Sequence, residues 1–193
     1  MSAKKSKVRI AFIGAGGMAN GVHYPSVASF DDAENVGICD VSPEAQNTTA
    51  DKYNVPKEAR FGETGVIEYQ TMIEKVSPGG VYVVGQPHLM IDIWLWCLKE
   101  GLNLYIENPM GLTIHQARSM AYLAEKHGCI TQVSHQRRSC PMRVKLREEC
   151  LKKGPITHAI CEFYKCDLQS YLTPRDHMMD DCTHSIDTVR WMC

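Results

Sequence analysis

The sequence predicts an α/β protein in which a doubly wound parallel sheet is followed by the beginning of an α+β domain. Three observations predict it: short apolar runs alternate with helical stretches, the first run ends in a glycine-rich turn, and the alternation stops after Ser134. A strand that helices cover on both faces is a near-continuous apolar run. The runs that we interpret as such strands are 8–13, 35–39, 80–84, 102–106 and 129–134.

Helical stretches lie between these runs. The first spans 17–29 and contains Pro25, which bends or interrupts a helix. Ser42 followed by Pro43 is typical of a helix start, so we expect Ser42 to cap a helix that continues to about Tyr53. Further helices are predicted over 66–75, 88–100 and 113–127.

The pattern differs beyond Ser134. A helix is predicted over 140–153, then a strand over 155–166 with both faces partly apolar, then a helix from about Asp180 onward. We expect residues 1–135 to form one domain and residues 136–193 to begin a second. A lone strand leaves unpaired backbone groups on both edges, so we expect the second domain to be incomplete and the chain to be truncated at its C-terminus.

Composition excludes several classes of protein. The chain has 193 residues with 21 Lys and Arg against 22 Asp and Glu, a formal net charge of −1, which indicates no nucleic-acid or membrane partner. Nine cysteines without a Cys-x-x-Cys pair indicate neither a disulfide framework nor a zinc ribbon, and we expect no metal site. There is no signal-peptide core and no run near the ~20 apolar residues of a membrane helix, so we expect a cytoplasmic protein.

The glycine-rich turn after the first run predicts a dinucleotide site. Residues 14–19 read Gly-Ala-Gly-Gly-Met-Ala, which has the form G-x-G-x-x-A. Gly14 permits a tight turn, and Gly16 lets the backbone approach a pyrophosphate closely. Gly17 and Met18 open the following helix, whose free N–H groups and dipole favour an anion. The context of strand, turn and helix makes this a Rossmann-type sheet.

Asp40, at the end of the second run, indicates which dinucleotide is bound. Its carboxylate can accept hydrogen bonds from both ribose hydroxyls of NAD and would repel the 2′-phosphate of NADP, so NAD is the preferred cofactor. The alternative is that Asp40 is only a turn residue at a strand end.

The sequence resembles the Gfo/Idh/MocA family of sugar and polyol dehydrogenases. Four segments carry the resemblance, and they follow one another in the family's order along the whole chain. They are the glycine turn with Asp40, Gly85-Gln86-Pro87, Glu107-Asn108-Pro109, and Asp180-x-x-x-His184-x-x-Asp187. The resemblance implies a second domain built on an open, mostly antiparallel sheet that supplies the substrate pocket and an oligomer interface, hence a homo-oligomer.

The resemblance also implies roles for individual residues. Gln86, Pro87 and Glu107 would line the cofactor site. Removal of a hydride from a carbinol carbon needs a base near neutrality, and His184 would be that base, with Asp180 as its acidic partner. The alternative is that Asp-x-x-x-His on a surface helix occurs by chance.

Asn108 departs from the family pattern, which has lysine there. An ammonium would stabilise developing alkoxide, and loss of such a charge typically costs ~10²–10³ in rate. Three explanations stay open: an engineered replacement, a natural member with altered chemistry, or a non-catalytic binding protein. Asn108 is therefore a candidate catalytic position that lacks the expected charge.

Further polar residues near the domain boundary are candidate substrate contacts. Arg137 or Arg138, with His135 beside them, could bind a substrate carboxylate or hydroxyls, or form only a solvated turn. Asp187 contributes either to structure or to substrate binding. A metal-dependent hydrolase using Cys182, His184 and Asp187 is poorly supported, because these residues lack a spaced partner set.

We therefore expect an oxidoreductase that transfers a hydride between NAD and a secondary hydroxyl of a sugar or cyclitol, impaired by Asn108 and by truncation. The alternative is a non-catalytic NAD-binding module with a regulatory or structural role.

Overall fold

A computed structural model describes residues 6–62, 68–162, 164 and 182–193 of the chain. Its centre is a parallel sheet of six strands in the order β3-β2-β1-β4-β5-β6. The strands are β1 (Val8–Ile13), β2 (Ala33–Cys39), β3 (Arg60–Phe61), β4 (Gly80–Val83), β5 (Leu104–Ile106) and β6 (Thr131–Val133). The strand order reverses between β1 and β4, as in a Rossmann sheet, so the predicted fold is confirmed.

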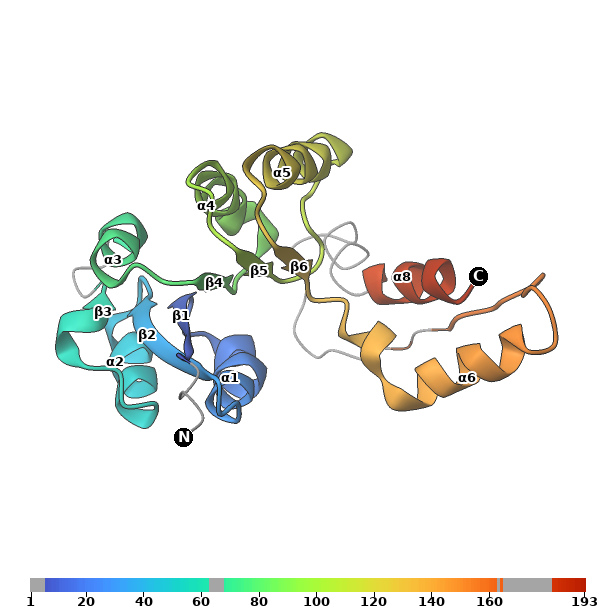
Figure 1. Cartoon of the computed structure of the whole chain (residues 1–193), viewed down its shortest axis with the longest axis horizontal. Helices are drawn as coiled ribbons and strands as arrows, with labels where there is room; N and C mark the ends of the chain where they lie inside the picture. Colours follow the sequence, from blue (N-terminus) through green and yellow to red (C-terminus); the bar gives the residue numbers. More distant parts are fainter. Residues whose placement is uncertain (1–5, 63–67, 163, 165–181) are drawn as a thin grey trace.

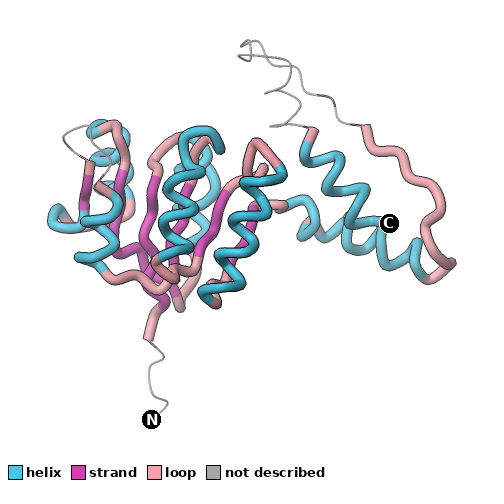
Figure 2. The backbone as a smooth tube through the Cα atoms, turned by 90° about the horizontal axis from the view of Figure 1, so that it is seen from above, coloured by secondary structure: helices cyan, strands magenta, loops and turns pink. Residues whose placement is uncertain are grey.

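Helices cover both faces of this sheet. Figure 1 shows α3 (Tyr69–Val76), α4 (Pro87–Lys99) and α5 (Ile114–His127) on one side, and α1 (Tyr24–Ala28) and α2 (Pro43–Lys52) on the other. Covered on both faces, the central strands are buried: Phe12, Ile38 and Val83 have no measurable exposed surface. Figure 2 shows the strands side by side in one layer.

Polar side chains cap two of the helix starts, Ser42 as predicted and Thr113 in addition. The Ser42 hydroxyl accepts a hydrogen bond from the Ala45 N–H at 3.3 Å, with Pro43 in the first turn of α2. Thr113 and Gln116 form a capping box at the start of α5, and Gly128 ends that helix in a left-handed conformation.

The helix with Pro25 differs from a regular α-helix. Residues Ala19–His23 form a π-helical segment, η1, which passes directly into α1. Proline has no N–H to donate within a helix, and the wider π turn lies just before it. The predicted interruption is therefore a change of helix type, and it leaves Ala19 and His23 buried.

The chain beyond β6 forms a separate helical body. A short 3-10 helix, η3 (Gln136–Ser139), is followed by α6 (Pro141–Leu151), and α8 (Thr183–Met192) lies beside α6 (Figure 2). The predicted strand over 155–166 is wrong for its described part, because residues 155–162 adopt no regular structure. Within the described part of the chain these residues pair with no strand, and an extended segment without a partner has no ladder to stabilise it.

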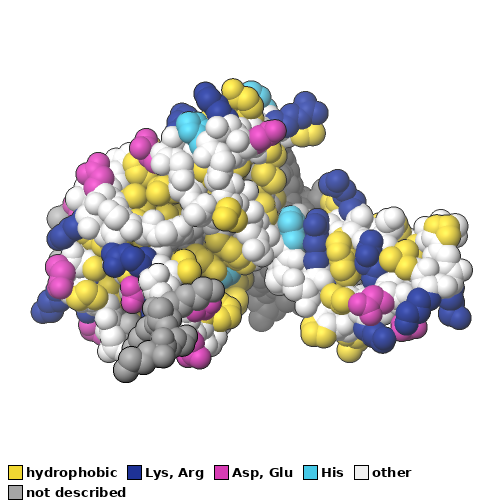
Figure 3. Space-filling view, in the orientation of Figure 1, with side chains coloured by type: hydrophobic (Ala, Val, Ile, Leu, Met, Phe, Trp, Pro, Cys, Tyr) yellow, Lys and Arg dark blue, Asp and Glu magenta, His cyan; other side chains and the backbone are white. Residues whose placement is uncertain are grey.

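The helix α6 is largely exposed. Among the residues that the structure describes, none in α6 is buried, and Met142 and Leu146 are 80% and 55% exposed. Figure 3 shows hydrophobic side chains interspersed with Lys and Arg over this part of the surface. In the described part of the chain, no helix is long and apolar enough to cross a membrane.

We expect Gly14→Ala to destabilise the fold. Gly14 has a φ of +112°, and a Cβ there would lie 2.1 Å from the Val84 carbonyl oxygen, so the turn would have to move. The free energy of unfolding should fall by about 2–4 kcal/mol in urea denaturation. Gly16→Ala is the matched control, since a Cβ there meets nothing within 4 Å. Equal stability of the two variants would contradict the expectation.

Candidate functional site

The glycine turn lies at the carboxyl end of β1, between β2 and β4. The Gly14 N–H donates to the Cys39 carbonyl at 2.8 Å, and its missing side chain leaves room for the Val84 carbonyl. Gly16 and Gly17 are exposed, and a Cβ at either would meet open space. An open cradle of backbone at a helix start fits a pyrophosphate, so these residues fit the predicted dinucleotide.

Asp40 holds this turn from the end of β2. Its Oδ2 accepts a hydrogen bond from the Ala15 N–H at 2.6 Å, and its Oδ1 accepts one from the Ser42 N–H at 2.7 Å. The expected turn role of Asp40 is therefore present. Each carboxylate oxygen can accept a further bond, so a ribose contact remains compatible with this arrangement.

Two polar residues that sequence reasoning missed also support the turn. The Asn20 amide donates to the Ala15 carbonyl at 2.7 Å, and it exchanges hydrogen bonds with the Thr49 hydroxyl of α2. Thr49 is buried. The turn is thus fixed by side chains from both flanking elements, which limits the cost of ordering it around a ligand.

The Tyr24 hydroxyl lies near the same turn and donates to the Gly14 carbonyl at 3.4 Å. Burial first, and the charge of Asp40 second, raise the pKa of Tyr24 far above its ordinary value. Tyr24 is therefore a neutral donor at physiological pH. Its ring stacks on Phe12 of β1, with the ring centroids 4.0 Å apart.

The 107–109 turn follows β5 at the same edge of the sheet. Asn108 is buried, and its Nδ2 donates to the Ser134 carbonyl at 2.6 Å. Glu107 is hydrogen-bonded to His23 of η1. The turn therefore has one side chain tied to the end of β6 and one tied to the helix that follows the glycine turn.

Gln86 and Pro87 occupy the start of α4, also at this edge. Gln86 is the exposed N-cap residue, and Pro87 is buried in the first turn. Met18 is exposed at the start of the helix after the glycine turn. The predicted cofactor residues thus share the edge formed by the carboxyl ends of the strands, where open α/β sheets bind ligands.

The predicted proton-transfer residues lie in and before α8. His184 is half-buried in the first turn of α8, and Asp180 lies outside the described residues. Asp187 faces η3, where Arg138 donates to both of its carboxylate oxygens through Nε and Nη2. Arg137 is half-buried in η3. Asp187 therefore joins α8 to η3 through Arg138, and its predicted contact with substrate stays a prediction.

The protonation state of Asp187, which joins α8 to η3, depends on the groups around its carboxylate. Burial opposes ionisation of Asp187, but the hydrogen bond from Arg138 and nearby positive charges lower its pKa below the ordinary value. His135 Nδ1 lies 3.7 Å from Asp187 Oδ2. Burial lowers the pKa of His135, only partly offset by Asp187. The carboxylate is thus ionised and held by Arg138.

Two further arginines bind α8 from α6. The Arg143 guanidinium donates to the Thr188 hydroxyl at 2.6 Å, and the Arg147 guanidinium donates to the Trp191 carbonyl at 2.8 Å. Arg147 also lies over the Trp191 ring, 5.2 Å from its centroid. Hydrogen bonds along one side of α8 therefore fix the helix that carries His184.

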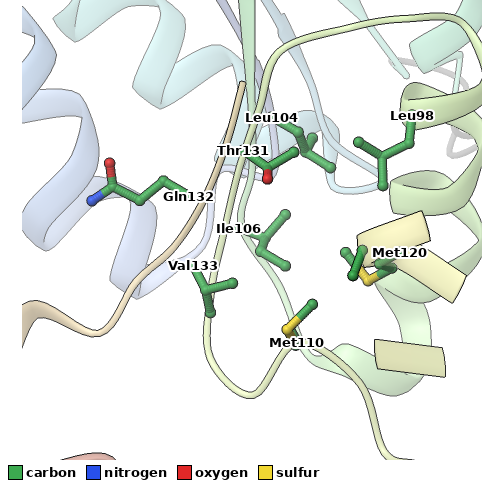
Figure 4. Close-up of a pocket in the computed structure, with 9 residues that line it drawn as sticks. Leu98, Leu104, Ile106, Met110, Met120, Thr131, Gln132 and Val133 are labelled. Carbon is green, nitrogen blue, oxygen red and sulfur yellow. The ribbon is translucent and has the colours of Figure 1, made fainter. Parts of the chain in front are cut away.

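A cavity of about 110 Å³ lies between the strands β5 and β6 and the helices α4 and α5 (Figure 4). Ile106, Met110 and Met120 line it together with other apolar side chains. Thr131 and Gln132 are its polar lining residues, and no lining residue is titratable. The cavity therefore supplies no acid, base or nucleophile to the site.

The two buried core cysteines, Cys39 and Cys97, have unreactive thiols. Burial raises the pKa of Cys39 to about 11 and that of Cys97 to about 12, so both are thiols near neutrality. Among the described residues, no group of three or more His, Cys, Asp or Glu side chains could hold a metal ion.

Comparison with protein families matches most of this chain to an oxidoreductase family. The family described as the oxidoreductase family with an NAD-binding Rossmann fold, Gfo/Idh/MocA, matches residues 8–135. A D-glucoside 3-dehydrogenase of Escherichia coli is 30% identical over 145 residues, which are 75% of this chain and 39% of that protein. The chain thus spans about two-fifths of that relative's length.

Solved structures share the fold. A dehydrogenase (MviM) from Clostridium difficile matches with a TM-score of 0.78 and 17% identity, covering 96% of this chain and 57% of that chain. A myo-inositol 2-dehydrogenase from Lactobacillus plantarum matches with a TM-score of 0.66 and 18% identity, covering 75% of this chain and 41% of that chain. The first of these similarities extends over α6 and α8 as well as the sheet.

We expect Arg138→Gln to loosen α8. The change removes the guanidinium that donates to both oxygens of the buried Asp187 carboxylate. This should cost about 1–3 kcal/mol in the free energy of packing α8 against η3. Hydrogen exchange measured by mass spectrometry should therefore accelerate in residues 183–192. Arg118→Gln, at an exposed position of α5, is the matched control. Unchanged exchange of α8 in Arg138→Gln would refute a docking role for Asp187.

Proposed function

We propose that the protein transfers a hydride between NAD and a secondary hydroxyl of a sugar or cyclitol. The premise is that this chain belongs to the Gfo/Idh/MocA oxidoreductase family, with its NAD-binding Rossmann fold. One observation carries the proposal: the glycine turn after β1 and the 107–109 turn after β5 meet at one edge of the sheet, joined through His23 and Glu107. The names of the glucoside and inositol dehydrogenases that the chain resembles support the class of substrate.

The cofactor would lie across this edge and would supply the hydride acceptor. Its contacts would come from residues 14–18 at the pyrophosphate, Asp40 at the adenosine ribose, and Gln86, Pro87 and Glu107 toward the nicotinamide. The open space beside Gly16 and Gly17 supports the first of these contacts. We propose residues 1–135 as the cofactor domain and residues 136–193 as the start of a substrate domain.

The substrate hydroxyl must lose its proton as the hydride leaves. We propose His184 as the base, because histidine is the side-chain type most suited to accepting a proton near neutrality. Asp180 would orient its ring. Arg137 would contact substrate hydroxyls, whereas Asp187 holds α8 in place through Arg138.

A second function is favoured by Asn108. This residue stands where the family has lysine, and its amide nitrogen is used in a hydrogen bond to the Ser134 carbonyl. A neutral amide gives developing alkoxide less electrostatic stabilisation than an ammonium. An NAD-binding module without turnover, with a regulatory or structural role, is therefore the alternative.

Asp40→Ser should reduce the preference for NAD over NADP. The variant loses the carboxylate that would repel a 2′-phosphate. The guanidinium of Arg60 on β3 already donates hydrogen bonds to Asn47, Asp51 and the Val55 carbonyl, so we expect the change in preference to come from the lost carboxylate. We expect NADH to bind about tenfold more weakly and the ratio of NADH to NADPH affinity to fall, measured by fluorescence titration. Glu44→Gln, at an exposed position in the first turn of α2, is the matched control. Equal affinity of the wild type for both cofactors would refute the preference.

Asn108→Lys should raise NAD-linked oxidation of a sugar or cyclitol by about 10²-fold, because an ammonium stabilises the developing alkoxide. NADH formation by the full-length protein on a panel of sugars, glycosides and cyclitols measures the rate. Asn108→Gln, which adds length without charge, is the matched control. If no substrate shows a gain while NAD still binds, the module without turnover is the better account.

A further inference from the structure

His23 is a buried histidine at the end of the π-helical segment η1. It is 4% exposed, and its ring lies against two aromatic side chains of the sheet. The ring centroids are 5.8 Å apart for His23 and Tyr82 of β4, and 5.2 Å apart for His23 and Tyr105 of β5. A buried imidazole among aromatic rings needs a hydrogen-bond partner, because an unpaired polar group is costly away from water.

Glu107 is that partner. His23 donates through Nε2 to Glu107 Oε1, across 84 positions of sequence. The Glu107 side chain is 15% exposed, so this carboxylate has little contact with water. Removing one member of a buried, charge-assisted pair leaves the other without a hydrogen-bond partner, which costs free energy. The pair therefore favours the arrangement in which the His23 and Glu107 side chains stay together.

The pair joins two segments that would contact different parts of a dinucleotide. His23 belongs to the helix that opens at the glycine turn, and Glu107 begins the 107–109 turn after β5. Asn108, the next residue of that turn, donates to the Ser134 carbonyl. The turn is therefore held on both sides, and His23 supplies the link to the glycine turn.

The sheet order separates this pair from Asp40. The order β2-β1-β4-β5 places Asp40 on one side of the glycine turn and Glu107 on the other. A dinucleotide crosses such a sheet where the strand order reverses, with its two halves on opposite sides of the pyrophosphate. Asp40 lies on the adenosine side, so Glu107 lies on the nicotinamide side.

We propose that His23 is a positioning residue: through Glu107 it fixes the 107–109 turn against the glycine turn, and it thereby sets the binding of the nicotinamide half of the dinucleotide without affecting the adenosine half. This inference rests on the proposed cofactor site and adds a residue to it. His23 itself touches the turn, and its effect on the cofactor passes through Glu107.

The test compares two ligands on the full-length protein by calorimetric titration. NADH carries both halves of the dinucleotide, whereas ADP-ribose keeps the adenosine and pyrophosphate and lacks the nicotinamide. His23→Leu should weaken NADH binding by at least about tenfold and leave ADP-ribose binding within about twofold. His115→Leu, at an exposed position of α5, is the matched control.

Conservative variants separate positioning from folding. His23→Gln keeps a side-chain N–H donor and Glu107→Gln keeps an acceptor, so both should recover much of the NADH affinity that His23→Leu and Glu107→Leu lose. If the Leu variants fail to fold, these two Gln variants give the readout: a partial loss of affinity confined to NADH supports the proposal, and no loss, or a loss as large for ADP-ribose as for NADH, overturns it.

The remaining outcomes also decide. If His23→Leu weakens both ligands equally, or neither, the proposal is wrong while the cofactor site stands, provided that Asp40→Ser weakens both. If the wild type binds neither NADH nor ADP-ribose, the proposed function fails and the inference fails with it.

Discussion

The passage of the chain between β2 and β4 at Gly14 is the constraint on which the rest of the site depends. The Gly14 N–H is held by the Cys39 carbonyl, and the Val84 carbonyl occupies the space where a side chain would stand. Only a residue without Cβ can turn there at a φ of +112°. Because the chain turns at this point, the Ala15 N–H meets the Asp40 carboxylate and the next helix begins with its open N–H groups at the sheet edge.

The sheet could be predicted from the sequence because its strands and caps are encoded locally. Apolar runs ending in glycine or a polar residue identified the central strands, and Ser42 identified a helix start through a hydrogen bond that spans three residues. β3 was missed because it has two residues, too few for any periodicity. The strand expected over 155–166 had a suitable pattern, but a strand is defined by its partner, and the described chain offers none for residues 155–162.

The candidate site could be predicted only in part, for the same reason. Motif residues such as Asp40 and Glu107 stand out by their place after a strand. The contacts of such residues cannot be predicted from the sequence in this way. The partner of Glu107 is His23, 84 positions away, and the partner of Asp187 is Arg138, 49 positions away. Long-range pairs of this kind follow from the order in which strands assemble, which no local pattern contains.

Contacts at the end of β6 connect the two parts of the chain. Asn108 binds the Ser134 carbonyl, and the next residue, His135, lies beside Asp187 of α8. A continuous path therefore runs from the 107–109 turn to the helix that carries His184. The last contact of this path, from Arg138 to the ionised Asp187, is a charge-assisted hydrogen bond with a defined direction. Asn108 therefore belongs to the 107–109 turn and also contacts Ser134, at the start of the segment that leads into the second part of the chain.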